Sequence, residues 1–257
     1  MPLWTPLAVM LAAFLGAGVV YALLAALAGS DASGIDDLPG ALIGATFFQD
    51  GALVAGAVFA LRLAGNAGRD ALGLRLTPLG SALGWAAAAY GAFWLANLLV
   101  LLIFGSPEEQ SLVEDLRREQ SVAVLAGYGV LVCLAAPLAE ELFFRGFLFP
   151  LLGSRIGVVW GMLVTGGVFS LVHATGSPVE ALIVLFVLGV GLCAVAYLTR
   201  SILPCIGLHA LNNAISFSAT RDFEWWAFLV VVVGSVVLAV GIAAAAAKQL
   251  RPVPAVA

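Results

Sequence analysis

The segment Val122–Phe149 reads VAVLAGYGVLVCLAAPLAEELFFRGFLF, and its first 18 residues, Val122–Ala139, contain no charged side chain. In an α-helix, 18 residues rise about 27 Å, close to the thickness of the hydrocarbon core of a bilayer. The run therefore predicts a helix that crosses a membrane. Two adjacent acidic residues, Glu140 and Glu141, follow it directly, so the same stretch places charge where lipid is expected.

The composition of the whole chain points to a lipid environment. Of its 257 residues 63% are apolar and only 10% are charged, and the mean hydropathy is +1.11. A soluble domain of this size could not bury so much apolar surface. The net charge of -4 comes without a basic block, so no nucleic-acid partner is expected.

Long apolar runs separated by short polar breaks predict an all-α fold, a polytopic transmembrane helical bundle of about eight spans. The sequence contains no internal repeat, so we expect a single integral membrane domain over residues 1–257. The expected spans lie near Leu7–Ala28, Ala41–Leu63, Leu79–Phe104, Val122–Phe149, Val158–His173, Val179–Leu198, Ile202–Phe217 and Trp226–Ala247.

The distribution of cations predicts that both termini are cytoplasmic. With the N-terminus inside, most cations fall on the cytoplasmic side, and only three fall outside. The first set is Arg62, Arg69, Arg75, Arg155, Arg200, Lys248 and Arg251, and the second is Arg117, Arg118 and Arg221. Short loops and the absence of targeting signals favour a prokaryotic plasma membrane.

The segment 107–120 is the only sizeable stretch expected outside the membrane. Leu112, Val113 and Leu116 form one apolar strip among charged residues. Two interpretations stay open, a helix lying on the outer interface and a solvated connecting helix.

Function has to be sought among polar residues inside the expected spans, because each costs on the order of a few kcal/mol there and marks a functional site by default. These residues are Asp50, Asn97, Glu140, Glu141, Arg145, His173, His209, Asn212 and Asn213. For Asp50 we expect a structural role, capping a polar contact near the outer end of the bundle.

The densest polar group is Glu140, Glu141 and Arg145, which we place at the inner end of the fourth span. Glu141 and Arg145 are four residues apart with the acid first, so they can form an ion pair on one helix face. Glu140 points away from that pair and has no local partner. An unpaired intramembrane carboxylate suits a general base acting on water. The alternative is a charge cluster that reaches the cytoplasmic headgroups.

The two histidines of the chain form the second and third polar elements. His173 ends the run Phe169–His173, and His209 lies one helical turn before Asn213. An imidazole and a carboxamide on one face can donate hydrogen bonds to an oxyanion, or the imidazole can bind a metal. A third alternative is an interhelical hydrogen bond. Cys205 lies four residues before His209, and we interpret it as a small hydrophobic residue rather than a ligand.

The order Glu-Glu-x-x-x-Arg, Phe-x-x-x-His and His-x-x-x-Asn on successive spans resembles the CAAX protease and bacteriocin-processing (Abi) family of intramembrane proteases. The resemblance covers about Pro137 to Asn213 and implies a catalytic core of about residues 122–218. It implies an intramembrane endopeptidase that cleaves a membrane-associated peptide or protein. By the resemblance, Glu140 and His173 activate water, Glu141 and Arg145 hold the helix, and His209 and Asn213 stabilise the oxyanion.

The metal requirement stays open at this point. Glu140, His173 and His209 match a zinc site with an open water position, but no helix carries His-Glu-x-x-His. A metal-free glutamate mechanism uses the same residues.

Other classes of protein remain as alternatives. Ser170 lacks the Gly-x-Ser-Gly setting of rhomboid-type serine proteases, and Asp50 is the only intramembrane aspartate, where an aspartyl type needs two. A transporter with a proton or cation path would show paired broken helices, which the sequence lacks. A non-catalytic membrane scaffold or immunity protein with a retained site is the remaining alternative.

The chemistry requires that Glu140, His173, His209 and Asn213 converge although they come from three spans. His173 falls near the outer end of its expected span, and Glu140 near the inner end of another. We therefore expect the site at mid-membrane, with Pro137 bending the fourth helix and a water-filled opening toward the cytoplasm.

Overall fold

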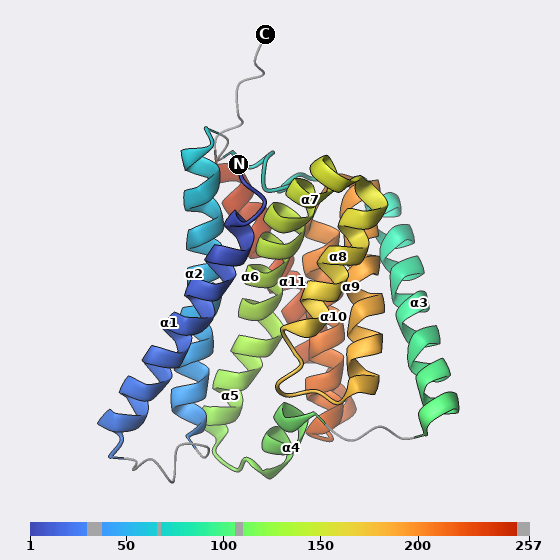
Figure 1. Cartoon of the computed structure of the whole chain (residues 1–257). Helices are drawn as coiled ribbons and strands as arrows, with labels where there is room; N and C mark the ends of the chain where they lie inside the picture. The colour runs from blue at the N-terminus through green and yellow to red at the C-terminus, as the bar shows by residue number, and fades with distance from the viewer. Residues whose placement is uncertain (30–37, 66–67, 106–109, 251–257) are drawn as a thin grey trace.

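A computed structural model describes residues 1–29, 38–65, 68–105 and 110–250, and every regular element within these ranges is helical. The all-α bundle expected from the sequence is confirmed (Figure 1). The α-helices are α1 (Thr5–Leu27), α2 (Pro39–Leu63), α3 (Leu79–Phe104), α4 (Ser111–Arg118), α5 (Val122–Val130), α6 (Ala136–Phe143), α7 (Phe149–Ile156), α8 (Val158–Leu171), α9 (Val179–Thr199), α10 (Leu203–Thr220) and α11 (Trp225–Gln249).

Six helical stretches in the described ranges are long and apolar enough to cross a membrane: α1, α2, α3, the run Val122–Ile156, α9 and α11. The two other expected spans are α8 and α10, and each departs from a full apolar span. α8 has only 14 residues, about 21 Å of helix, and Figure 1 shows it ending inside the bundle. α10 has 18 residues and carries His209, Asn212 and Asn213.

The run Val122–Ile156, called the central helix, is one 35-residue helix that includes two π-helical turns, η2 (Leu131–Ala135) and η3 (Phe144–Leu148). Each π turn is followed within two residues by a proline, Pro137 and Pro150. Because proline has no N–H, it cannot bond the carbonyl five residues before it, and the widened turn absorbs the resulting mismatch.

The length of this helix corrects the sequence interpretation. The fourth span was expected to end at Phe149, which placed Glu140 at its inner end. The helix runs on to Ile156, so Glu140 lies near its middle.

Close helix crossings hold the half of the bundle that contains α8 and α9. A Cβ built on Gly166 of α8 would lie 2.9 Å from the backbone nitrogen of Val190, and one built on Gly189 of α9 would lie 2.9 Å from Gly166 Cα. The backbones of the two helices touch here, which only glycine permits. Small residues at such crossings are typical of helix packing in lipid.

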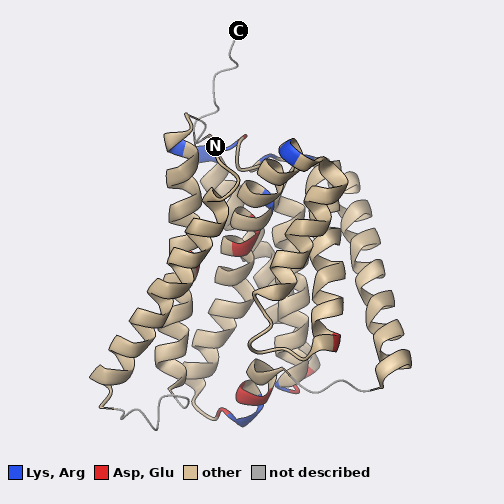
Figure 2. Ribbon diagram, in the orientation of Figure 1, with Lys and Arg blue, Asp and Glu red and all other residues tan. Residues whose placement is uncertain are grey.

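Charged residues gather at opposite ends of the bundle (Figure 2). We call one the basic end, defined by Arg62, Arg69, Arg75, Arg155, Arg200 and Lys248. The other, which includes α4, is the acidic end, defined by Glu114, Asp115, Glu119, Glu180, Asp222 and Glu224. Arg117, Arg118 and Arg221 lie at the acidic end as expected. Arg251 and residues 107–109 lie outside the described ranges.

The glycine crossing gives a stability prediction with a matched control. Gly166→Ala should destabilise the protein, because the new methyl would lie 2.6 Å from Val190 Cγ2 and 2.9 Å from backbone, and overpacking of this kind costs about 1–3 kcal/mol. Gly167→Ala, in the same helix, meets nothing within 4 Å and should be neutral or stabilising. Thermal unfolding in detergent measures both. Equal melting temperatures for the two variants would contradict the crossing.

Candidate active site

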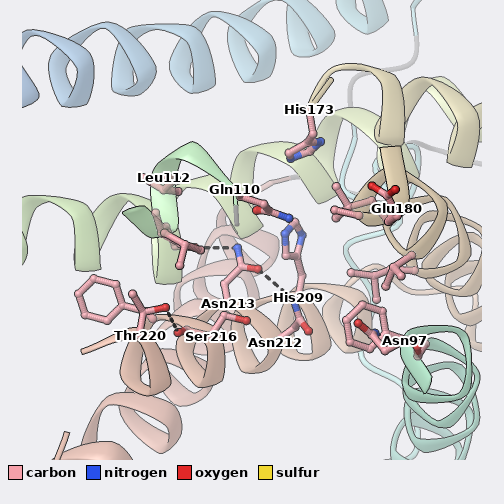
Figure 3. A pocket seen from close by; sticks show the side chains of 18 of the residues that line it. Asn97, Gln110, Leu112, His173, Glu180, His209, Asn212, Asn213, Ser216 and Thr220 are labelled. Atoms are coloured by element: carbon pink, nitrogen blue, oxygen red, sulfur yellow. Dashed lines mark hydrogen bonds between the residues drawn. The ribbon is translucent and has the colours of Figure 1, made fainter. Parts of the chain in front are cut away.

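A cavity of about 720 Å³ begins at the middle of the bundle and is lined by the four residues that the sequence analysis expected to converge: Glu140, His173, His209 and Asn213. They come from α6, the turn after α8, and α10. Figure 3 shows the two imidazoles and the Asn213 carboxamide directed into the same space. The four residues, from three segments, thus line one cavity, and within it Glu140 Oε2 lies 4.0 Å from His209 Nε2.

Glu141 and Arg145 do not line the cavity and instead form a fully buried ion pair behind it. Arg145 Nη1 donates to Glu141 Oε1 at 2.7 Å, and both side chains are 0% exposed. Arg145 Nη2 donates to the carbonyl oxygen of Gly189 at 3.0 Å. The pair expected from the four-residue spacing is confirmed, and it ties the central helix to α9.

His209 lies between the two glutamates. Its Nδ1 is 2.8 Å from Glu141 Oε1, and its Nε2 is 4.0 Å from Glu140 Oε2. Glu141 is ionised against Arg145 and can only accept, so His209 Nδ1 carries the proton of this hydrogen bond. The buried Glu140 Oε2 accepts no hydrogen bond from the described residues. His209 thus presents Nε2 to the cavity beside an uncommitted carboxylate oxygen.

His173 is oriented in the same way by a different acceptor. Its Nδ1 is 2.8 Å from the carbonyl oxygen of Phe169. A carbonyl oxygen only accepts, so Nδ1 is protonated and neutral His173 keeps a free lone pair on Nε2. The helix ends at Leu171, which turns His173 into the cavity at mid-depth.

The Phe169 ring packs against three of the polar side chains of the site, His173, His209 and Arg145. Its ring centroid lies 5.1 Å from that of His173 and 5.8 Å from that of His209. The guanidinium carbon of Arg145 lies 4.6 Å from the centroid of the Phe169 ring, within the range of a cation–π interaction. The ring, 1% exposed, therefore fixes the relative positions of the two imidazoles and the ion pair.

The Asn213 amide is oriented by the π turn of the central helix. In η2 the N–H of Ala136 bonds the carbonyl of Leu131, five residues earlier. The next such donor would be Pro137, which has none, so the Val132 carbonyl is free. Asn213 Nδ2 donates to it at 3.0 Å, and Asn212 Nδ2 donates to Asn213 Oδ1 at 3.3 Å. One amide N–H of Asn213 remains for a ligand in the cavity.

Three residues that hold the site, Phe169, Gly189 and Val132, were not expected from the sequence. Phe169 stood in the quoted motif, four residues before His173, and that spacing was the available signal. Gly189 and Val132 act through backbone carbonyls, and their side chains give no indication of this.

Two expectations about the site are wrong. The cavity does not open on the side of Arg62 and Arg155. Its lining residues lie at mid-depth or in the half of the bundle toward α4, including Gln110 and Thr220. Asp50 does not lie near an end of the bundle. It is at the middle of α2, 4% exposed, with Oδ2 unpartnered among the described residues and within electrostatic range of Glu140.

The structure does not support Ser170 as a nucleophile or Cys205 as a metal ligand. Ser170 Oγ donates to the carbonyl of Leu182 at 2.6 Å and is not bonded to an imidazole, so it is not arranged as a serine nucleophile. Cys205 is 0% exposed, and its Sγ lies 3.3 Å from the carbonyl oxygen of Leu192. It is core filling, as expected for a free buried cysteine.

The donor set does not fit a metal site in this arrangement. Among the described residues no group of three or more His, Cys, Asp or Glu side chains could hold a metal ion. Glu140 Oε2 and His209 Nε2, at 4.0 Å, are further apart than the roughly 3.3 Å implied by two 2 Å bonds in tetrahedral geometry. We derive no catalytic step through a metal.

Comparison with known proteins bears on this site directly. Residues 122–215 match the family model described as Type II CAAX prenyl endopeptidase Rce1-like. The match covers the central helix, α8, α9 and most of α10, and it confirms the resemblance found in the motifs. No curated protein and no solved structure matches the chain.

The buried Glu141–Arg145 pair gives a stability prediction. Glu141→Ala should cost about 3–5 kcal/mol, because it leaves the Arg145 guanidinium buried without a counterion. Glu114→Ala, which breaks the exposed pair of the same spacing with Arg118, should cost less than about 1 kcal/mol. Thermal unfolding in detergent compares the two. A stable Glu141→Ala variant would show that Arg145 does not depend on this carboxylate.

Proposed function

We propose that this protein, Rce1-like over residues 122–215, is an intramembrane endopeptidase that cleaves a membrane-associated peptide or protein with water activated by Glu140. The observation that carries the proposal is the position of Glu140 Oε2, which has no hydrogen-bond partner among the described residues and lies 4.0 Å from His209 Nε2. Both side chains line the cavity, together with His173 and Asn213.

The first step requires a base for water. Glu140 Oε2 is buried and uncommitted, and the free Nε2 lone pair of His173 can accept a hydrogen bond from the same water. Glu140 takes the proton while the water oxygen bonds to the carbonyl carbon of the substrate, whose π electrons move to oxygen. His173 orients the water.

The second step requires stabilisation of the tetrahedral oxyanion. The remaining N–H of the Asn213 amide can donate to it as it stands, because the Val132 carbonyl fixes the amide orientation. His209 can donate from Nε2 only after it receives a proton, and Glu140 Oε2 is the neighbouring source. Glu141 keeps the ring in place through Nδ1 in both states.

The last step breaks the C–N bond. The proton taken from water, shared between Glu140 and His209, passes to the leaving amine, and the electrons of the oxyanion re-form the carbonyl. The second proton of the water stays on the new carboxyl group, and Glu140 returns to its starting state.

The base gives a sharp prediction. Glu140→Gln should lower hydrolysis by about 100- to 10,000-fold, the usual contribution of a general base, with little change in unfolding temperature because shape is kept. Glu180→Gln, the other carboxylate that lines the cavity, should lower it far less. The readout is new protein N-termini in membranes from cells that express each form. N-termini that persist with Glu140→Gln would exclude Glu140 as base.

Metal content is tested separately. Zinc is the ion that this ligand chemistry would favour, but the mechanism proposed above predicts that a chelator leaves activity intact. It also predicts equal metal content in the wild type, His173→Ala and His209→Ala. Activity that is lost to chelator, returns with zinc, and is accompanied by metal loss in both variants would replace the glutamate mechanism with a zinc mechanism.

A further inference from the structure

We propose that the polypeptide substrate enters the cavity from the acidic end, which is extracytoplasmic, and lies extended along a polar stripe of α10. The inference rests on the proposed function for the identity of the occupant. It concerns the side of the membrane from which the substrate comes and the path that it follows.

The cavity leads from the catalytic residues to the acidic end. On α9 its lining runs from Leu188 back to Glu180, and on α10 it runs from His209 to Thr220, the last residue of that helix. α4 contributes Leu112 to the same lining. Each helix therefore lines the cavity with the half that approaches the acidic end.

α4 lies across the end of the cavity at the acidic end, which we call the mouth, and is held by hydrogen bonds at both of its ends. The Ser111 N–H donates to the Gly176 carbonyl, in the turn that follows His173, at 3.1 Å. At the other end Arg221 Nη1 donates to the Leu116 carbonyl at 2.8 Å. The apolar strip predicted from the sequence faces inward, since Leu116 is 3% exposed.

The basic end is filled by protein. Leu72 and Leu74, from the connection between α2 and α3, are each 3% exposed and belong to the same buried cluster as Phe147 and Ile202. The Ile202 N–H donates to the Gly73 carbonyl at 2.9 Å. The start of α10 is thus sealed against this connection.

The walls of the cavity suit an extended peptide. Asn212, Ser216 and Thr220 follow at four-residue intervals and form a polar stripe that leads from His209 to the mouth (Figure 3). Across the cavity, α3 contributes the apolar side chains Trp94, Leu98 and Leu101. The polar stripe can form hydrogen bonds with the backbone of the substrate, while the apolar side chains of α3 can contact apolar side chains of the substrate. From His209 to Thr220 the helix rises about 16 Å, which matches about five residues of extended chain.

The charge distribution assigns the side of the membrane. Cations concentrate in cytoplasmic loops, and the basic end carries six of the nine described cations near the membrane surfaces. The acidic end is then extracytoplasmic. The substrate is accordingly a polypeptide segment already translocated or held in the outer leaflet, rather than one presented from the cytoplasm.

Cysteine labelling with a membrane-impermeant maleimide tests this access. Ser216→Cys places a thiol on the polar stripe, and Ser154→Cys places one on the exposed end of α7 at the basic end. The native cysteines are all buried, so the wild type sets the background. In right-side-out vesicles Ser216→Cys should be labelled and Ser154→Cys should not, and inverted vesicles should give the reverse.

Failure to label Ser216→Cys from outside in right-side-out vesicles would overturn the proposal. Labelling does not require hydrolysis, so the experiment is repeated with Glu140→Gln present in both variants. The same pattern there supports the access route independently of whether the protein is a peptidase. A protein that labels as predicted but cleaves nothing would refute only the proposed function.

Discussion

A carboxylate buried at the middle of a membrane bundle must be neutralised, and the neutralisation of Glu141 organises the whole site. Its Oε1 accepts from Arg145 and from His209 Nδ1. Arg145 in turn bonds the Gly189 carbonyl and lies over the Phe169 ring. The Glu141–Arg145 pair thereby connects four helices: the helix Val122–Ile156, α8, α9 and α10. The arrangement leaves Glu140 uncommitted beside His209 Nε2, which is the condition that water activation requires.

The backbone is irregular where the site needs it. The π turn before Pro137 frees a carbonyl that orients Asn213, and the early end of α8 places His173 in the cavity that Glu140 also lines. The contact between Gly166 and Gly189 allows α9 to approach closely enough to receive Arg145. Departures from regular helix geometry concentrate at functional sites in this way.

The sequence was sufficient for the helical class, for the Glu141–Arg145 pair and for four of the residues that line the cavity, because apolar runs and four-residue spacings are local properties. It could not predict the contact between His209 and Glu141, which are 68 residues apart and meet only through packing. The predicted direction of the cavity opening was wrong for a specific reason. The fourth span was expected to end at Phe149, just before Pro150, whereas the helix continues to Ile156, and this error moved Glu140 from the middle of the helix to its inner end.

Both histidines are held through Nδ1 so that Nε2 faces the cavity, and the proposed roles of the two rings depend on this. Nitrogen-15 NMR of histidine-labelled protein measures this directly, because the chain contains only two histidines and ring nitrogens with and without a proton differ strongly in chemical shift. We expect a protonated Nδ1 in both rings, assigned with His173→Gln. A ring with a bare Nδ1 and a protonated Nε2 would contradict it, since that imidazole could not make its observed hydrogen bond and also present a lone pair to the cavity.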